Sequence, residues 1–252
     1  RRRFRLVAAG VGLVAGAIGC GGAMVFVSAC IAATCAGDHA VGGAENTGVP
    51  AAGACAERLR CPVRIGAFSA CSNVTGVFTP YHAMAKLVHR AGGVAFIDCA
   101  ACAPYVAMDM HPADPEERLD AALFSPHKFL GGPGSAGVLV MGRALYRNTV
   151  PDDAGGGTVA WTNPWGQYAF LDDVEAREDA GTPGFLQTIK AALAVRLKEA
   201  MGVEPMARRE AQIVPYAMDR LEAIPRVRLL ARAQRHRLAM LSFHVEGVHY
   251  NL

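Results

Sequence analysis

The sequence predicts an α/β protein whose sheet is mostly parallel. From Val63 onward, short apolar runs of strand length alternate with longer segments of helical periodicity. The apolar runs show little alternation between apolar and polar residues, which is typical of strands covered on both faces. The chain has 252 residues and 52% hydrophobic content, which is enough to bury a core of this kind.

The predicted elements are bounded by glycine, proline or charged residues. Strands are expected at 63–68, 94–97, 121–124, 137–141, 227–230 and 239–245. Helices are expected at about 80–91, 185–200 and 205–223. For the first helix, the sequence predicts Thr79 as N-cap and an inner face formed by Ala83, Leu87 and Val88.

Three parts are predicted along the chain: a divergent N-terminal segment (1–62), a large domain (63–203) and the beginning of a truncated small α+β domain (204–252). No residue between Leu6 and Gly37 is charged, and an arginine-rich stretch precedes this run, as in membrane anchors. The run is rich in glycine, which weakens that interpretation. We therefore expect a cytoplasmic protein, with an anchor through 6–37 as the alternative. Whether 1–62 is native sequence, a transmembrane segment or a reading-frame artefact stays open.

Charge and cysteine spacing exclude several classes of function. The formal net charge is +3, and much of it comes from the first five residues, so we expect no nucleic-acid partner. Cys99 and Cys102 form a CxxC pair, but no second pair lies at zinc-site spacing. We therefore expect buried, reduced thiols and no metal site. The glycines after Lys128 lack the spacing of a nucleotide phosphate loop.

Lys128 is the residue that most needs a chemical explanation. It lies in 123–137, Leu-Phe-Ser-Pro-His-Lys-Phe-Leu-Gly-Gly-Pro-Gly-Ser-Ala-Gly, between a short apolar run and a glycine-rich turn. A lysine amine whose pKa is lowered by desolvation or a nearby cation can attack a carbonyl and form a Schiff base. Ser125 and His127 can donate hydrogen bonds to an anion beside it. Asp98 ends the preceding strand-like run and supplies a carboxylate.

Two further segments complete a recognisable set of motifs: 68–76, Phe-Ser-Ala-Cys-Ser-Asn-Val-Thr-Gly, and 178–183, Glu-Asp-Ala-Gly-Thr-Pro. Together with 123–137 they resemble the class V aminotransferase family of pyridoxal-phosphate-dependent enzymes, most closely its cysteine-desulfurase-like branch. The resemblance extends from about Cys61 to Glu246. It implies the large domain of fold-type I pyridoxal-phosphate transferases, pyridoxal 5'-phosphate as cofactor, an amino-acid substrate, and a homodimer with a shared active site.

The resemblance also implies a role for each matching residue. Lys128 is the catalytic residue that forms the Schiff base and moves the proton at the substrate Cα. Five other residues are implied to bind the cofactor: Asp98 at the pyridine nitrogen, Asn73 at the phenolic oxygen, Ser125 and His127 at the phosphate, and Thr182 at the phosphate across the dimer interface. Thr182 is also a candidate N-cap of the following helix, and the two roles can coexist.

Several features depart from the family pattern. Ala101 stands where many members have a glutamine, and the histidine that stacks on the cofactor ring has no counterpart after Ser28. The family's cysteine nucleophile and its substrate-carboxylate arginine belong to a C-terminal portion that we do not find in this chain. The sequence therefore predicts a pyridoxal-phosphate-dependent transferase or lyase. The alternative is a catalytically inactive homologue that acts as a binding or scaffold protein, with or without a membrane anchor.

Overall fold

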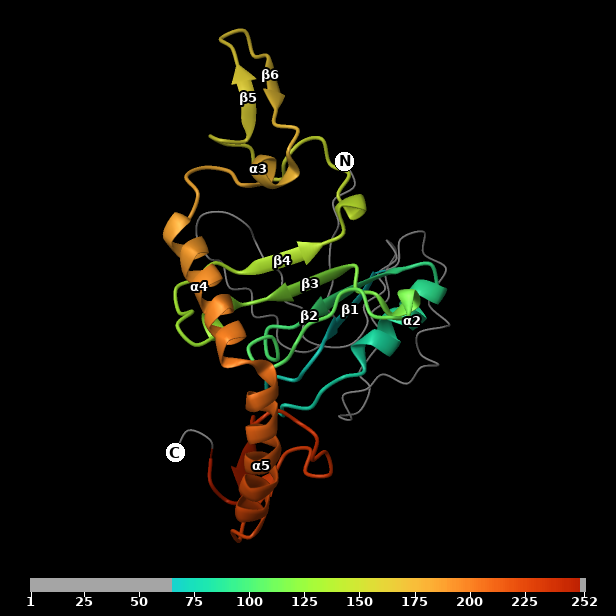
Figure 1. Ribbon diagram of the computed structural model, residues 1–252, viewed down its shortest axis with the longest axis vertical. Coiled ribbons are helices and arrows are strands. Elements are labelled where there is room, and N and C mark those ends of the chain that lie inside the picture. The colour runs from blue at the N-terminus through green and yellow to red at the C-terminus, as the bar shows by residue number, and fades with distance from the viewer. Residues whose placement is uncertain (1–64, 250–252) are drawn as a thin grey trace.

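The computed structural model describes residues 65–249. Its centre is a sheet in the order β1-β2-β3-β4, formed by β1 (Ile65–Ser69), β2 (Val94–Asp98), β3 (Ala121–Phe124) and β4 (Val138–Met141). The first three strands are parallel, and β4 is antiparallel to β3 (Figure 1). The predicted α/β class with a mostly parallel sheet is thereby confirmed, and all four strands lie within two residues of their predicted ends.

Helix α2 (Tyr81–Arg90) connects β1 to β2. The side chains that pack against the core are spaced three or four residues apart, as one helix face requires: Tyr81, Met84, Ala85 and Val88. The prediction that Ala83 and Leu87 belong to this face is wrong, because both side chains are exposed. Each lies two residues from the buried Ala85, which corresponds to about 200° of rotation around the helix.

Thr79 does not cap α2, contrary to the prediction. The N-cap is Pro80, and no side chain caps the helix there. The Thr79 hydroxyl instead donates a hydrogen bond to the carbonyl of Ser69 at 2.6 Å. Since Ser69 is the last residue of β1, this bond ties the beginning of α2 to the carboxyl end of the strand.

A hairpin that the sequence did not predict follows the sheet. It consists of β5 (Val159–Thr162) and β6 (Tyr168–Phe170), and α3 (Val174–Glu178) comes directly after it. The Asn163 side chain closes the turn by accepting hydrogen bonds from the backbone of Trp165 at 3.1 Å and of Gln167 at 3.0 Å. In Figure 1 the hairpin and α5 lie at opposite ends of the molecule.

Two long helices complete the described part of the chain, with one small two-stranded sheet beyond them. Helices α4 (Phe185–Met201) and α5 (Val203–Glu222) are joined by Gly202, whose φ of 76° places it in the left-handed region. Strand β7 (Val227–Leu229) pairs antiparallel with β8 (Phe243–Val245). Both helices and both strands were predicted, although β8 is shorter than the expected 239–245. The division into domains 63–203 and 204–252 stays a prediction.

The main core lies around the central sheet. Its larger buried members are Phe68, Ile97, Leu119, Phe124, Phe129 and Leu238. A smaller cluster, Val214, Met218 and Leu229, joins α5 to β7. Strand β4 is less covered than predicted: Leu139 is 48% exposed and Val140 is 44% exposed, so β4 is not buried on both faces.

Helices within residues 65–249 are all too short or too polar to cross a membrane. The predicted anchor segment 6–37 and the divergent segment 1–62 lie outside the described residues.

Candidate active site

Three of the predicted site segments meet at one edge of the sheet. Because β1, β2 and β3 are parallel, their carboxyl ends lie side by side: Ser69 pairs with Asp98, and Asp98 pairs with Leu123. The turn that carries Asn73 follows β1, Asp98 ends β2, and Ser125 follows β3. This edge is where open α/β sheets bind their ligands.

Asp98 is a half-buried carboxyl group held by the backbone that follows it. Its Oδ1 accepts a hydrogen bond from the backbone N–H of Ala100 at 2.8 Å. Burial raises the pKa of Asp98 above its ordinary value, although the Ala100 hydrogen bond and the charge of Lys128 act in the opposite direction. Burial disfavours the charged form of a carboxyl group, and a cationic ligand bound beside the group stabilises that form.

The Lys128 turn leaves the sheet as the short 3₁₀-helix η2 (Pro126–Lys128). Ser125 is 2% exposed, whereas His127 and Lys128 point outward and are exposed. The turn closes tightly on Gly132: a Cβ at that position would lie 1.8 Å from the Pro126 carbonyl oxygen. This contact leaves no room for a side chain at 132.

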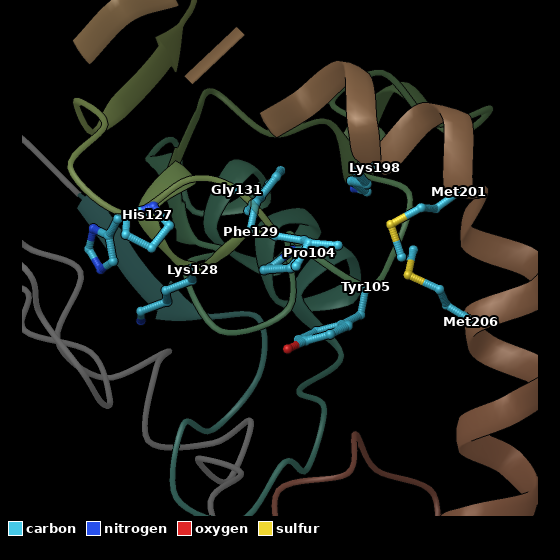
Figure 2. A pocket seen from close by; sticks show the side chains of 11 residues that line it. Pro104, Tyr105, His127, Lys128, Phe129, Gly131, Lys198, Met201 and Met206 are labelled. Atoms are coloured by element: carbon cyan, nitrogen blue, oxygen red, sulfur yellow. The ribbon is translucent and has the colours of Figure 1, made fainter. Parts of the chain in front are cut away.

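A pocket of about 420 Å³ opens beside the Lys128 turn. Its lining comes from η2 and the residues after it, from the loop after β2, and from the junction of α4 and α5. Figure 2 shows His127 and Lys128 on one side and Met201 and Met206 on the other. The pocket thus combines an apolar wall with the exposed cationic side chain of Lys128.

Lys198 is a site-lining residue that the sequence analysis missed. Its Nζ donates hydrogen bonds to the carbonyls of Ala103 at 2.5 Å and Val106 at 2.6 Å, and it lies 5.6 Å from the Phe129 ring centroid. Burial lowers the pKa of Lys198. Through these bonds Lys198 holds the turn that follows Asp98. The acceptors are backbone carbonyls 92 and 95 residues away, so no local pattern indicated this role.

Asn73 and Thr182 are both exposed and both lie on turns. In the Asn73 turn, the Ser72 hydroxyl accepts hydrogen bonds from two backbone N–H groups, at 3.2 and 3.1 Å. Thr182 follows Gly181, whose N–H donates to the Gly156 carbonyl at 2.7 Å. Thr182 is not the N-cap of α4, because Gly184 has that position.

The structure therefore brings some predicted site residues together and leaves one apart. Asp98, Ser125, His127 and Lys128 share the carboxyl edge of two neighbouring strands. Among the contacts described within residues 65–249, none links Thr182 to the Lys128 turn.

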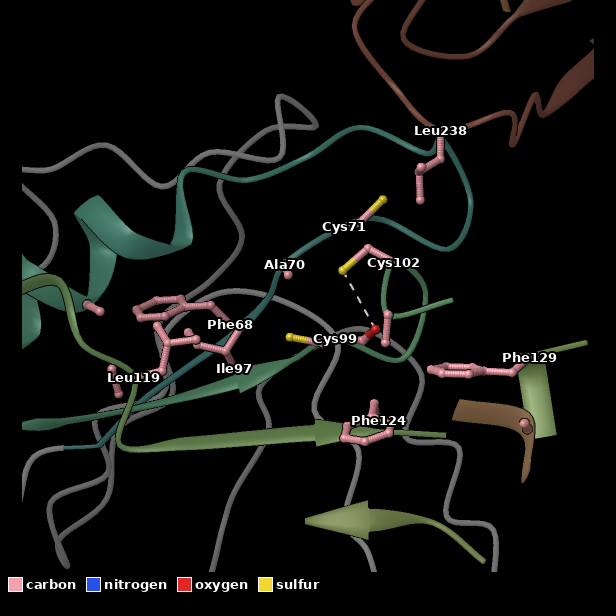
Figure 3. Close-up of a cluster of buried hydrophobic side chains, with 14 residues drawn as sticks. Phe68, Ala70, Cys71, Ile97, Cys99, Cys102, Leu119, Phe124, Phe129 and Leu238 are labelled. Carbon is pink, nitrogen blue, oxygen red and sulfur yellow. Dashed lines mark hydrogen bonds between the residues drawn. The ribbon is translucent and has the colours of Figure 1, made fainter. Parts of the chain in front are cut away.

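The thiols behind this edge are buried. Cys71, Cys99 and Cys102 are free and belong to the main core (Figure 3), in agreement with the prediction of buried thiols. The Cys102 thiol donates to the Cys99 carbonyl at 3.6 Å, and burial raises the pKa of Cys71 to about 12. Within the described range, no group of three or more metal-ligating side chains is placed to hold an ion.

Comparison with known sequences identifies the class of protein. Residues 40–252 match the aminotransferase class-V family, and the chain belongs to that family. The probable cysteine desulfurase 2 of Mycobacterium leprae (strain TN) is 31% identical over 188 residues, which cover 74% of this chain and 43% of the relative. The cysteine desulfurase of Synechococcus elongatus is 30% identical over 184 residues, which cover 73% of this chain and 28% of the relative. This chain thus spans less than half the length of these relatives.

Solved structures give the same result for the fold. The cysteine desulfurase CsdA of Escherichia coli superposes with a TM-score of 0.63 at 26% identity, covering 75% of this chain and 45% of that one. The cysteine desulfurase of Thermococcus onnurineus NA1 gives a TM-score of 0.61 at 25% identity, covering 73% and 45%. The expected fold-type I pyridoxal-phosphate transferase fold and the resemblance to cysteine desulfurases are thereby confirmed.

Proposed function

We propose that the protein is a pyridoxal-phosphate-dependent enzyme of the cysteine desulfurase type that acts on an amino acid, with Lys128 holding the cofactor covalently through its amine. One observation carries this proposal: Asp98 ends β2 and Lys128 follows the neighbouring parallel strand β3, at the edge where such sheets bind ligands. The relatives matched over about three quarters of this chain are cysteine desulfurases, which supports the same reaction class.

The side chains present at this edge fit the cofactor. Pyridoxal phosphate offers an aldehyde, a basic ring nitrogen and a phosphate, which need an amine, a carboxyl group and hydrogen-bond donors. Lys128 supplies the amine and Asp98 the carboxyl group, which burial makes costly to keep charged without a cationic partner. Ser125 and His127 supply a hydroxyl and an imidazole next to Lys128. We propose that the Asn73 side chain contacts the phenolic oxygen of the cofactor.

Each residue then has a definite task. When bound, pyridoxal phosphate serves as an electron sink for negative charge at the substrate Cα. Asp98 stabilises the proton on the ring nitrogen; its Oδ1 already accepts from Ala100, so we assign Oδ2 to this pairing. Lys128 would accept and return the proton at the substrate Cα as a general base and acid. Lys198 keeps the loop after Asp98 in place.

We also propose that two copies of the chain share the site, with Thr182 reaching the phosphate bound by the partner. Helix α4, which follows Thr182, carries large apolar side chains that are exposed in the single chain: Phe185, Leu186, Ile189 and Leu193. A contiguous apolar face of this kind is typical of a protein interface. The cytoplasmic location stays a prediction.

The experiment that tests the proposal is covalent trapping. The purified chain is incubated with pyridoxal phosphate, reduced with borohydride, digested and mapped by mass spectrometry. We expect an adduct on Lys128 that is absent from Lys128→Ala and retained in Lys190→Ala, a control at an exposed lysine of α4. Folded protein without an adduct contradicts the proposal. An adduct without turnover of any amino acid favours the inactive homologue.

A further inference from the structure

Arg237 is a buried cation that the proposed chemistry does not use. It is 5% exposed, and all three of its guanidinium nitrogens donate to backbone carbonyls. Nε bonds the carbonyl of Gln234 at 2.6 Å, Nη1 bonds that of Leu230 at 3.1 Å, and Nη2 bonds that of Ala231. These acceptors belong to one turn before Arg237, so the guanidinium holds this segment together.

The fourth acceptor of Arg237 lies 162 residues away in the sequence. Nη1 also donates to the carbonyl of Thr75 at 3.1 Å, in the turn that carries Asn73. Next to this bond, Arg237 and Val77 form an antiparallel backbone bridge. The guanidinium therefore connects the segment near the C-terminal end to the turn that follows β1.

Two more hydrogen bonds fix the carbonyls on either side of Thr75. The Ser242 hydroxyl donates to the Val74 carbonyl at 2.6 Å, and the Leu238 N–H donates to the Gly76 carbonyl at 2.9 Å. Consecutive carbonyls at 74, 75 and 76 are thus all bound by residues 237–242.

The approach of the two segments is close enough to require glycine. Gly76 has a φ of 71°, and a Cβ there would lie 2.5 Å from the Leu238 carbonyl oxygen. Leu238 is 3% exposed and packs into the main core together with Cys71, at the edge of the core shown in Figure 3. The contact is therefore part of the packed interior and not a surface association.

Burying a cation is costly unless its hydrogen bonds are satisfied. The described partners of Arg237 are all backbone carbonyls, and desolvation together with the neighbouring Arg235 lowers the pKa of Arg237. Arg237 therefore gains its stabilisation by ordering backbone, and one of the four carbonyls that it binds belongs to the Asn73 turn.

We propose that Arg237 is a positioning residue for Asn73: with Ser242, it fixes the turn 72–76 so that the Asn73 amide is presented at the carboxyl edge of the sheet. This inference rests on the proposed function, because it assumes that Asn73 contacts the cofactor. It makes cofactor affinity depend on a segment that lies more than 150 residues from the turn.

The test combines cofactor titration with amide hydrogen exchange on the purified chain. Arg237→Gln is expected to weaken pyridoxal phosphate binding by about tenfold or more, since hydrogen bonds to a charged group are lost. It is also expected to speed exchange of the amides at 74–77 in the absence of cofactor. Because Arg237 acts through Asn73, the double variant with Asn73→Ala is expected to bind no more weakly than Asn73→Ala alone.

Arg235→Gln is the matched control. Arg235 lies two residues away and pairs with Asp219 at 2.6 Å on the surface, so its loss is expected to change neither binding nor exchange at 74–77. Ser242→Ala, which removes only the bond to Val74, covers the case in which Arg237→Gln does not fold. It is expected to weaken binding by about two- to fivefold and to speed exchange at 74–76.

Three results would overturn the inference: unchanged exchange at 74–77, unchanged affinity, or losses of affinity that multiply in the double variant. Where Arg237→Gln does not fold, amide exchange and cofactor affinity are measured on Ser242→Ala instead. If the unmodified chain does not bind pyridoxal phosphate, the proposed function fails and the positioning role fails with it. Faster exchange in the variants then shows only that Arg237 orders the turn.

Discussion

The proposed site has two halves that are built differently. Asp98 and Ser125 stand at the ends of sheet strands, partly or fully buried, and their positions follow from strand pairing. Asn73, His127 and Thr182 lie on turns and are exposed. The strand half is fixed by the core beneath it, whereas the Asn73 turn is bonded by the distant Arg237. Substitutions in the two halves should therefore differ in their effects on the free energy of unfolding and on cofactor affinity.

The largest effect should come from the core below the strand half. Ile97 is fully buried next to Asp98, and Ile97→Ala is expected to lower the free energy of unfolding by about 2–5 kcal/mol, because it leaves a cavity. Leu139→Ala on β4 is the control: that side chain is 48% exposed, so a loss of about 1 kcal/mol or less is expected. Urea denaturation measures both, and equal losses would contradict the comparison.

A smaller loss of stability is expected at Lys198, which holds the loop after Asp98. Lys198→Met keeps an apolar stem but removes both hydrogen bonds to the carbonyls of Ala103 and Val106. We expect a loss of about 1–3 kcal/mol in the free energy of unfolding, because these carbonyls lose their charged partner. Lys190→Met, on the exposed surface of the same helix, should have little effect in the same denaturation experiment. Similar behaviour of the two variants would argue against the anchoring role.

Thr182→Ala separates ligand binding from stability. Thr182 is exposed, so the free energy of unfolding should change by no more than about 0.5 kcal/mol. Affinity for pyridoxal phosphate is expected to fall by about three- to tenfold, through loss of one hydrogen bond across the dimer. Titrations at protein concentrations above and below dimer dissociation, found by sedimentation, check this, with Thr188→Ala as the control. A loss that is the same in monomer and dimer would contradict a role across the interface.

The smallest effect concerns the charge of Asp98. Burial raises its folded-state pKa above the unfolded value of 3.8, so between these values the folded state binds more protons and stability falls as pH rises. Asp98→Asn, which keeps an acceptor for Ala100, should therefore make the cofactor-free chain slightly more stable at pH 7.

This advantage should shrink as the pH falls through the folded-state pKa towards 3.8, where the unfolded state is protonated too. Urea denaturation at a series of pH values measures it. A cofactor-free variant that is less stable than the parent chain at neutral pH would show that burial does not dominate at Asp98.

The elements predicted from the sequence are those whose side chains are consistently buried or consistently exposed on a given face. Strand β3 has its predicted ends, Ala121 and Phe124, because a short apolar run between polar residues fits a covered strand. The β5–β6 hairpin was missed because it has no buried face that could impose a pattern: Trp161 and Tyr168 are both more than half exposed. Its turn depends on the Asn163 side chain, and asparagine occurs in many kinds of turn.

The same distinction applies to the site. Position-by-position matching placed Asp98, Ser125 and Lys128 in neighbouring segments, and the structure brings them to one edge of the sheet. Lys198 and Arg237 could not be predicted, because their acceptors are backbone carbonyls, which any residue type provides. Only the three-dimensional fold brings these carbonyls within reach of the two side chains.

The tight closure at Gly132 limits how this turn can change over evolution. Since any Cβ there would overlap the Pro126 carbonyl, a substitution must displace the peptide that lies between Ser125 and Lys128. The distance between the buried Ser125 hydroxyl and the exposed Lys128 amine therefore depends on a glycine at position 132. Substitution of Gly132 is disfavoured for steric reasons alone, and this holds whichever residues occupy the neighbouring positions.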